Sequence, residues 1–294
     1  MSAEHIVSSL IKATLPNSLS HLQSYFLHEV NQLVHYSPTI GLMGKTGVGK
    51  SSLCNALFQS NVSAISDVES GTQTAKRLQM TLGKRTLTLI DFPRIGESLS
   101  CDKTYQALYQ QMLPELDLII WVLKADDRAW TSDEVTYRFL TQHCGYQAAQ
   151  FLFVINQADK IEPCREWDVH ACHPSHQQAN HLQLKIDAVQ KAFSPHHPVI
   201  AISAKEGYQI DVFVEHFIHA LPAKASSSTL TQLKPVYRTE HINSQAKQDF
   251  GQCVNQAMDD LIYQLPLPMG IKDTFIQIKD TLVSAVVSLW RWLF

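Results

Sequence analysis

The segment at residues 44–51 constrains the fold of this chain more than any other. It reads Gly-Lys-Thr-Gly-Val-Gly-Lys-Ser and follows directly on an apolar run at 39–43. The spacing of its glycines permits a turn tight enough for successive backbone N–H groups to point inward at one polyphosphate. The helical sequence at 51–58 adds the positive end of a helix dipole. A strand, a loop and a helix in this order predict a phosphate-binding loop rather than a glycine-rich turn without a ligand.

Two side chains of this loop carry specific chemistry. We expect Lys50 to reach the β- and γ-phosphates of a nucleotide and Ser51 to place its hydroxyl on Mg²⁺. The backbone of the loop and of the first helical turn should hold the phosphates. The residues expected to bind the nucleotide here are Lys45, Thr46, Gly47, Val48, Gly49, Lys50, Ser51 and Ser52.

Short apolar segments alternate with helical ones over the middle of the chain. Strands are predicted near 39–43, 77–82, 86–91, 117–123, 150–155 and 198–202. Helices are predicted near 50–59, 102–112, 132–143, 180–193 and 209–220. This alternation predicts a doubly wound α/β fold with a mostly parallel, six-stranded sheet covered by helices on both faces. The second and third strands flank Gly83 and Lys84, which predicts a hairpin at one edge and one antiparallel strand.

Both ends of the chain are predicted to be helical extensions. Apolar residues repeat at three- and four-residue spacing between residues 6 and 34, which is typical of a helical arm that packs on the body. A small polar stretch at 224–229 indicates a domain boundary. The division that follows is an N-terminal helical arm (1–37), an α/β phosphate-binding domain (38–225) and a C-terminal helical region (226–294).

Composition and the N-terminus indicate the compartment. The net charge of −3 gives no long-range attraction to nucleic acid. The six cysteines are scattered over a long chain, which favours reduced thiols in the cytosol. The N-terminus lacks the features of a secretory signal, and no stretch reaches the roughly 18 to 20 uninterrupted apolar residues that a spanning helix needs. We therefore expect a cytoplasmic protein.

A second nucleotide-binding pattern lies at residues 154–163, which read Val-Ile-Asn-Gln-Ala-Asp-Lys-Ile-Glu-Pro. Asn156 and Asp159 follow an apolar strand, at the edge of the sheet where ligands of doubly wound folds bind. A carboxylate at this point can accept hydrogen bonds from both N1–H and the exocyclic amino group of guanine, a pair of donors that adenine lacks. Since a site that leaves a buried polar group unpaired rejects the wrong ligand by roughly 10⁴ or more, the pattern predicts selectivity for guanine. An ordinary strand-ending turn is the alternative.

A third segment favours the guanine interpretation. Ser203, Ala204 and Lys205 follow the predicted strand that ends at residue 202. The full set expected to bind the base is Asn156, Gln157, Asp159, Lys160, Ser203, Ala204 and Lys205.

Five separated elements between residues 39 and 222 resemble the Era-like, translation-factor-related bacterial GTPases. The resemblance rests on the phosphate loop with its helix, on Leu-Pro-Glu-Leu-Asp at 113–117 and on the segment at 154–163. Within that family the chain is similar to the small proteins described as ribosome-binding GTPases. The resemblance implies a Ras-like P-loop G domain that binds GTP and GDP with Mg²⁺ and hydrolyses GTP to GDP and phosphate.

The resemblance also implies roles for two residues outside the loops. Thr74 matches the switch threonine that completes the Mg²⁺ shell when the γ-phosphate is present, with Thr72 as the alternative. Asp91 matches the carboxylate that orients a Mg²⁺-bound water, since Mg²⁺ keeps several waters and takes few protein ligands. The catalytic set is then Lys50, Thr74 and Asp91, and the metal set is Ser51, Thr74 and Asp91.

Departures from the family pattern affect catalysis. Where the family has Asp-x-Pro-Gly, this chain has Asp91-Phe92-Pro93-Arg94, and Ile95 occupies the place of the water-positioning glutamine. Arg94 is either an exposed loop residue or a donor to the γ-phosphate. These differences predict slow intrinsic hydrolysis in a regulatory switch. They also leave open a nucleotide-gated scaffold that binds GTP, turns it over little and acts on a protein effector through its helical ends.

One weaker pattern is a crowd of cysteines and histidines after the guanine segment. A solvated loop explains it better than a zinc site, because there is no Cys-x2-Cys pair. The residues concerned are Cys164, His170, Cys172, His173, His176 and His181.

The C-terminal helix is the other weaker pattern. It starts at Phe275 and ends in an aromatic group that includes Trp290 and Trp292. Packing on the body or on a second protomer and insertion into a membrane interface at the inner membrane are both open. The region 226–294 lacks the Gly-x-x-Gly loop and basic face of an RNA-binding KH module, so ribosome contact rests on the family resemblance alone.

Overall fold

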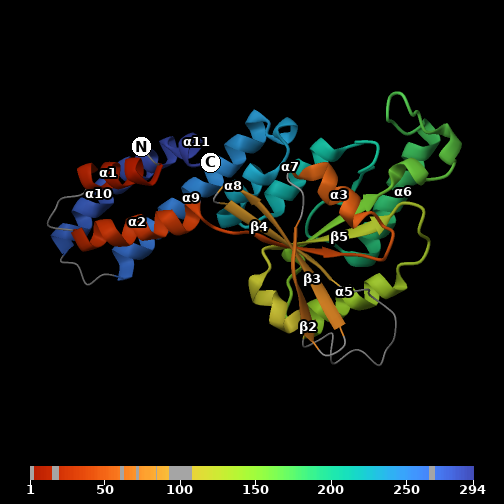
Figure 1. The fold of residues 1–294 in the computed structure, drawn as a ribbon, viewed down its shortest axis with the longest axis horizontal. Helices are drawn as coiled ribbons and strands as arrows, with labels where there is room; N and C mark the ends of the chain where they lie inside the picture. Colours follow the sequence, from red (N-terminus) through yellow and green to blue (C-terminus); the bar gives the residue numbers. More distant parts are fainter. Residues whose placement is uncertain are drawn as a thin grey trace.

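The computed structural model describes residues 3–14, 20–59, 63–70, 73–83, 85–92, 108–264 and 269–294. The strands are β1 (Thr39–Met43), β2 (Ser63–Ser70), β3 (Gln73–Leu82), β4 (Arg85–Asp91), β5 (Leu118–Lys124), β6 (Phe151–Asn156) and β7 (Ile200–Ala201). The helices are α1 (Ala3–Thr14), α2 (Ser20–Val34), α3 (Lys50–Leu57), α5 (Thr131–His143), α6 (His176–Phe193), α7 (Ile210–Ala220), α8 (Ala223–Gln232), α9 (Glu240–Gln264), α10 (Met269–Ser288) and α11 (Trp290–Leu293). One sheet forms the centre, and helices lie on both of its faces (Figure 1).

The predicted doubly wound α/β fold is confirmed, but the sheet has one more strand than expected. Its order is β2-β3-β4-β1-β5-β6-β7, so it contains seven strands instead of six. β2 pairs with β3, and its sequence Ser-Ala-Ile-Ser-Asp-Val-Glu-Ser is too polar to stand out as a strand. β3 is antiparallel to both of its neighbours and the remaining pairs are parallel, so a single strand runs in the reverse direction, as expected. The predicted hairpin of β3 and β4 therefore lies one strand inside the edge.

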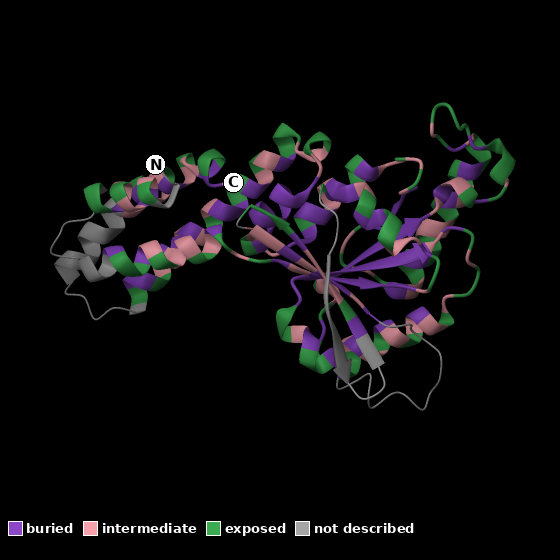
Figure 2. Cartoon of the chain, viewed as in Figure 1, coloured by how far each residue is buried: buried purple, intermediate pink, exposed green. Residues whose placement is uncertain are grey.

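The alternation of side chains along β5 explains why the sheet is covered on both sides. Leu118, Ile120 and Val122 belong to one hydrophobic cluster, and Ile119 and Trp121 belong to another on the opposite face. Successive residues of a strand point to opposite faces, so a strand that is apolar throughout needs two covering layers. Figure 2 shows the buried strands between exposed helical surfaces. The carboxyl ends of these strands form a rigid edge on which a site can be built.

Helices from both ends of the chain pack together beside this α/β body. α1 and α2 contact each other, and they also contact α10 and α9 respectively. These helices extend away from the sheet, and the two termini lie near one another (Figure 1).

The polar stretch at 224–229, expected to mark a domain boundary, forms part of the buried helix α8. The boundary predicted between residues 225 and 226 therefore falls inside a helix that contacts β3, β4 and α9. Ser226 Oγ donates to Ala223 O within the helix over 3.1 Å, and Ser227 Oγ donates to Ala246 O of α9 over 3.0 Å. The hydroxyls of Ser228 and Thr229 are buried and have no hydrogen-bond partner among the described residues. Serine and threonine are exposed in most proteins, so the polarity of this stretch did not indicate that it is buried.

The C-terminal helices pack on the body in this structure. Leu282, Val286 and Trp290 are buried, and the indole Nε1–H of Trp290 donates to Ser227 Oγ over 2.9 Å. Trp292 is 76% exposed, whereas the side chain of Phe275 lies outside the described residues. Within the described ranges, none of the helices is both long enough and apolar enough to cross a membrane.

Candidate functional site

The phosphate loop connects β1 to the first turn of α3, and its glycines are required by the backbone. Gly44, Gly47 and Gly49 have φ of +132°, +81° and +93°. A Cβ at Gly44 would lie 2.2 Å from the carbonyl oxygen of Val122, and one at Gly49 would lie 2.4 Å from Asn156 Nδ2. The loop therefore combines left-handed backbone angles with close approach of neighbouring chain, which only glycine tolerates.

Lys50 lies across this loop. Its Nζ donates to the carbonyl oxygen of Gly44 over 2.9 Å, and its side chain is 14% exposed. The same Nζ lies 3.6 Å from Oδ1 of Asp91, which brings together two residues predicted for catalysis. Burial raises the pKa of Asp91, and the positive charge of Lys50 partly offsets that rise.

The oxygens around Lys50 fit a divalent cation. Oδ1 of Asp91 is buried and forms no hydrogen bond. Ser51 is exposed at the start of α3, next to Lys50. The carboxylate oxygen of Asp91, which has no hydrogen bond, and the accessible hydroxyl of Ser51 both lie beside Lys50, and they match the few oxygen ligands that Mg²⁺ takes from proteins. The predicted threonine, Thr74, lies in β3, where its backbone is opposite Glu69 of β2. Its side chain lies outside the described residues.

Other predicted positions in this part of the site cannot be placed. Thr72, Arg94 and Ile95 lie outside the described residues, as does most of the helix expected near 102–112, of which residues 108–112 are described.

Asn156 joins the guanine segment to the phosphate loop. It ends β6 and is 1% exposed. Its Nδ2 donates to the carbonyl oxygen of Val48 over 2.9 Å, and its Oδ1 accepts from the backbone N–H of Ala204 over 3.0 Å. The backbone N–H of Ala204, which the resemblance places near guanine O6, is therefore bonded to Asn156 here.

Gln157 also contacts the loop, through a hydrogen bond of 2.7 Å from Nε2 to the carbonyl oxygen of Gly47. It has φ of +62°, and its Oε1 accepts from Lys160 Nζ over 3.0 Å. The sequence predicts Gln157 as a residue that binds the base. In the structure it is a second link between the two segments.

Asp159 faces a pocket beside these links. Its Oδ1 accepts a hydrogen bond of 2.6 Å from Ser203 Oγ, and Oδ2 has no partner within the described part of the chain. Lys160 and Lys205 are exposed at the rim. The pocket has a cavity volume of about 90 Å³ and is lined by Gly49, Ser52, Asn156, Gln157, Asp159, Lys160, Ser203 and Lys205. The structure thus brings eight of the predicted base- and phosphate-binding residues to one pocket, where a carboxylate oxygen of Asp159 is available to accept hydrogen bonds.

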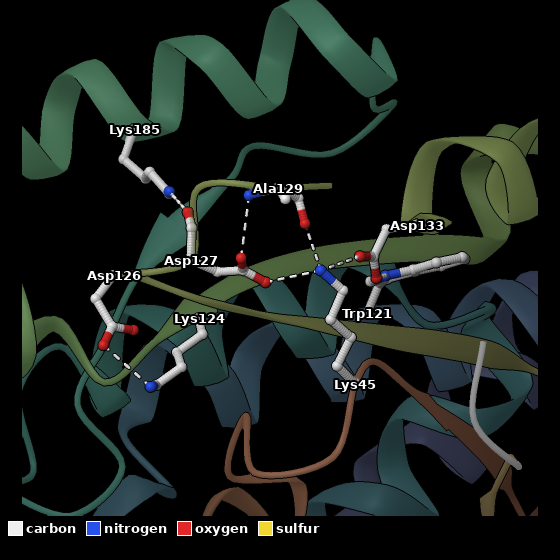
Figure 3. Close-up of polar contacts among 8 residues, drawn as sticks. All are labelled: Lys45, Trp121, Lys124, Asp126, Asp127, Ala129, Asp133 and Lys185. Carbon is white, nitrogen blue, oxygen red and sulfur yellow. Dashed lines mark hydrogen bonds and ion pairs between the residues drawn. The ribbon is translucent and has the colours of Figure 1, made fainter. Parts of the chain in front are cut away.

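Lys45 differs from the other loop residues because its side chain leaves the loop. Its Nζ donates to Oδ2 of Asp127 over 2.8 Å and lies 3.4 Å from Oδ2 of Asp133 (Figure 3). Thr46 and Gly47 are exposed at the loop, and Val48 is buried beneath it. The sequence predicts Lys45 at the phosphates and does not point to Asp127 or Asp133, because nothing in their local sequence links them to a loop more than 80 positions earlier.

The cysteine and histidine residues after the guanine segment do not converge. Cys164 is exposed and Cys172 is half-buried. Among the described residues there is no group of three or more His, Cys, Asp and Glu side chains placed to hold a metal ion.

Comparisons with known proteins agree with this architecture. Residues 39–157 match the family described as "50S ribosome-binding GTPase". The "Uncharacterized protein YkfA" of Escherichia coli (strain K12) is 39% identical, over 91% of this chain and 91% of that protein. The "Uncharacterized protein YfjP" of the same strain is 38% identical, over 95% of this chain and 97% of that protein. "GTPase Era" of Thermoanaerobacter sp. (strain X514) is 25% identical, over 64% of this chain and 56% of Era.

Proposed function

Since this chain belongs to the Era-like P-loop GTPases, we propose that it binds GTP and GDP with Mg²⁺ and hydrolyses GTP to GDP and phosphate. The observation that carries the proposal is the hydrogen bond of Asn156 to Val48, which joins a pocket with a carboxylate acceptor to a glycine-dependent phosphate loop. The base and the polyphosphate of a nucleotide are attached to one ribose, so the base pocket and the phosphate loop must lie at a fixed distance from each other. The hydrogen bond of Asn156 holds them at that distance.

Each part of the nucleotide has its own residues in this proposal. The backbone of residues 45–52 and the ammonium of Lys50 hold the phosphates. The carboxylate of Asp159 accepts hydrogen bonds from guanine N1–H and the exocyclic amino group, and Asn156 and Ala204 position the edge of the base that carries these donors. Asn156 stays bonded to the loop, so the distance between the base and the phosphates is fixed.

Catalysis in this proposal is positioning and electrostatic stabilisation. Phosphoryl transfer requires little covalent chemistry from the protein, because charge spreads over the phosphoryl oxygens in the transition state. Lys50 donates to that charge, and Ser51, Thr74 and Asp91 hold Mg²⁺ and its water. When bound, Mg²⁺ neutralises charge on the β- and γ-phosphates. Asp91 can hold the cation only when it is ionised, and the adjacent Lys50 favours that form.

We further propose that intrinsic turnover is slow and that the protein acts as a cytoplasmic regulatory switch on a protein effector. Ile95 in place of a water-positioning glutamine supports the slow rate. The same substitution, together with Arg94, supports the second candidate, a scaffold that binds GTP and scarcely hydrolyses it. A ribosomal partner is proposed from the family resemblance alone, and contact with the inner membrane rests on the exposed Trp292.

Single-turnover phosphate release separates the two candidates. Purified protein is mixed with excess Mg²⁺ and limiting GTP, alone and with cell lysate, and the Lys50→Ala variant serves as the inactive control. A GTPase releases phosphate at a rate below about 1 s⁻¹, the lower end of typical enzyme turnover, and Lys50→Ala abolishes it. Bound GTP that stays intact under both conditions identifies the scaffold.

A further inference from the structure

The side chain of Lys45 connects the phosphate loop to helix α5 and to the loop that precedes it. We infer that the side chain of Lys45 has a positioning role: it holds the phosphate loop in its anion-binding form and thereby slows the release of bound nucleotide, although the ammonium itself does not contact the nucleotide. The part of the inference that concerns nucleotide release rests on the proposed function. The part that concerns the conformation of the loop rests on the contacts of Lys45 alone.

Three oxygens surround the ammonium of Lys45. Oδ2 of Asp127 accepts over 2.8 Å, the carbonyl oxygen of Ala129 accepts a further hydrogen bond, and Oδ2 of Asp133 lies 3.4 Å away. Figure 3 shows the ammonium at the centre of these groups, directed away from the loop from which it originates. Lys45 therefore uses its charge on protein oxygens and not on the inside of the phosphate loop.

The burial of Asp133 makes this connection hard to break. Asp133 is 1% exposed, and Lys45 is the one cation within ion-pair distance of it in the described ranges. Its Oδ1 accepts from the indole Nε1–H of Trp121 over 3.1 Å, whereas its Oδ2 forms no hydrogen bond. Removing one partner of a buried charge pair leaves an uncompensated charge. Asp133 thus favours conformations of the loop in which Lys45 is within reach.

The other end of the connection is itself fixed. Oδ1 of Asp127 accepts a hydrogen bond from the backbone N–H of Ala129 over 3.0 Å. The backbone carbonyl oxygen of Asp127 accepts a hydrogen bond from Lys185 of α6. The ammonium of Lys185 also lies 4.2 Å from the ring centroid of Trp130. Lys45 is consequently attached to a segment that α6 holds in place, and not to a free loop.

A loop with three glycines at positive φ has much conformational freedom to lose on binding. Restricting such a loop beforehand increases affinity, because the ligand no longer has to order it. Lys45 follows Gly44, whose carbonyl oxygen accepts from Lys50. Fixing Lys45 therefore fixes the start of the loop, next to the lysine expected at the phosphates.

The test compares three variants with a matched control. Lys45→Met removes the ammonium, Asp133→Asn removes the buried charge with little change of shape, and the double variant removes both. Lys124→Met is the control, because Lys124 pairs with Asp126 at 3.0 Å on the same segment and is similarly exposed. Within the described residues, its side chain forms no hydrogen bond or ion pair with the phosphate loop.

Dissociation of a fluorescent GDP analogue and the melting temperature are measured on each full-length protein. We expect Lys45→Met to speed dissociation about tenfold or more and to lower the melting temperature, since a buried carboxylate loses its partner. In the double variant the melting temperature should recover toward that of the unaltered protein while dissociation stays fast. Lys124→Met should change dissociation by less than about twofold, as expected for an exposed pair. If the double variant recovers both the melting temperature and the slow dissociation of the unaltered protein, Lys45 contributes only to stability and the inference is overturned.

Hydrogen exchange of the loop amides without nucleotide separates this inference from the proposed function. Exchange at residues 45–50 should be faster in Lys45→Met and in the double variant, and unchanged in Lys124→Met. If the unaltered protein binds no GDP, the proposed function fails, and the exchange rates still decide whether Lys45 orders the loop. Equal exchange rates in all four proteins overturn the inference.

Discussion

Asn156 Nδ2 and the carbonyl oxygen of Val48 lie 2.9 Å apart, although 108 positions of sequence separate them. This bond connects the end of β6 to the phosphate loop, at a residue that is 1% exposed. It makes the base pocket and the phosphate loop one rigid unit, so a change at Asn156 should affect both stability and nucleotide binding.

Asn156→Ala should lower the free energy of unfolding and weaken GDP binding. The substitution leaves the carbonyl oxygen of Val48 and the N–H of Ala204 without partners, and each unsatisfied buried group costs about 1–3 kcal/mol. Urea unfolding and titration with a fluorescent GDP analogue measure the two effects. Gln157→Ala is the control. Gln157 is only half-buried, so the loss of its hydrogen bond to Gly47 should lower the free energy of unfolding by less than about 1 kcal/mol. Equal losses in the two variants would contradict this role for Asn156.

Gly49→Ala should abolish measurable nucleotide binding, whereas Gly47→Ala should only weaken it. Both residues have positive φ, which costs roughly 1–3 kcal/mol for alanine. A Cβ at Gly49 would also lie 2.4 Å from Asn156 Nδ2, while one at Gly47 meets nothing within 4 Å. The difference between the two GDP affinities therefore measures the clash separately from the backbone strain. Identical affinities would show that Asn156 moves aside at no cost.

Trp290→Phe should destabilise the protein, and Trp292→Phe should leave its stability unchanged. The first substitution removes the hydrogen bond from Nε1 to Ser227 Oγ, which is worth about 1 kcal/mol, and the second changes a side chain that is 76% exposed. Thermal unfolding of both variants checks this. Loss of stability on changing Trp292 would mean that the C-terminal end packs differently.

Cys54 should resist alkylation in the native protein while Cys164 reacts. Burial, followed by the negative charge of Asp91, raises the pKa of Cys54 to about 12, so its thiolate is absent at neutral pH. Cys164 is exposed. Peptide mapping after brief treatment with iodoacetamide reports each thiol separately, and urea-unfolded protein is the control in which both react. Rapid labelling of Cys54 in the native state would indicate that α3 opens easily.

The fold was predictable from the sequence because its strongest signals are local. The apolar strands, the glycine loop and the end of β6 at Asn156 each depend on a few consecutive residues. β2 escaped notice because its polar residues are held by backbone pairing with β3. The buried helix α8 was not predicted because its serine and threonine side chains look hydrophilic in a sequence.

The candidate site was predictable where its residues follow the ends of strands. Asn156, Asp159 and Ser203 lie at the carboxyl end of the sheet because each comes at or just after the end of a predicted strand. The partners of Lys45 do not, because Asp127 and Asp133 reach it only through the packing of β5 and α5 beside the loop. Contacts between distant segments depend on tertiary structure and leave no spacing pattern in the chain.

Competition between GDP and ADP tests the central claim most directly. Protein loaded with a fluorescent guanine nucleotide and Mg²⁺ is mixed with each competitor at rising concentration, and the Asp159→Ala variant is measured alongside. Displacement by GDP, no displacement by ADP at millimolar concentration and loss of this preference in Asp159→Ala are the predicted results. Equal displacement by both nucleotides, or no binding of guanine nucleotide at all, would contradict the account.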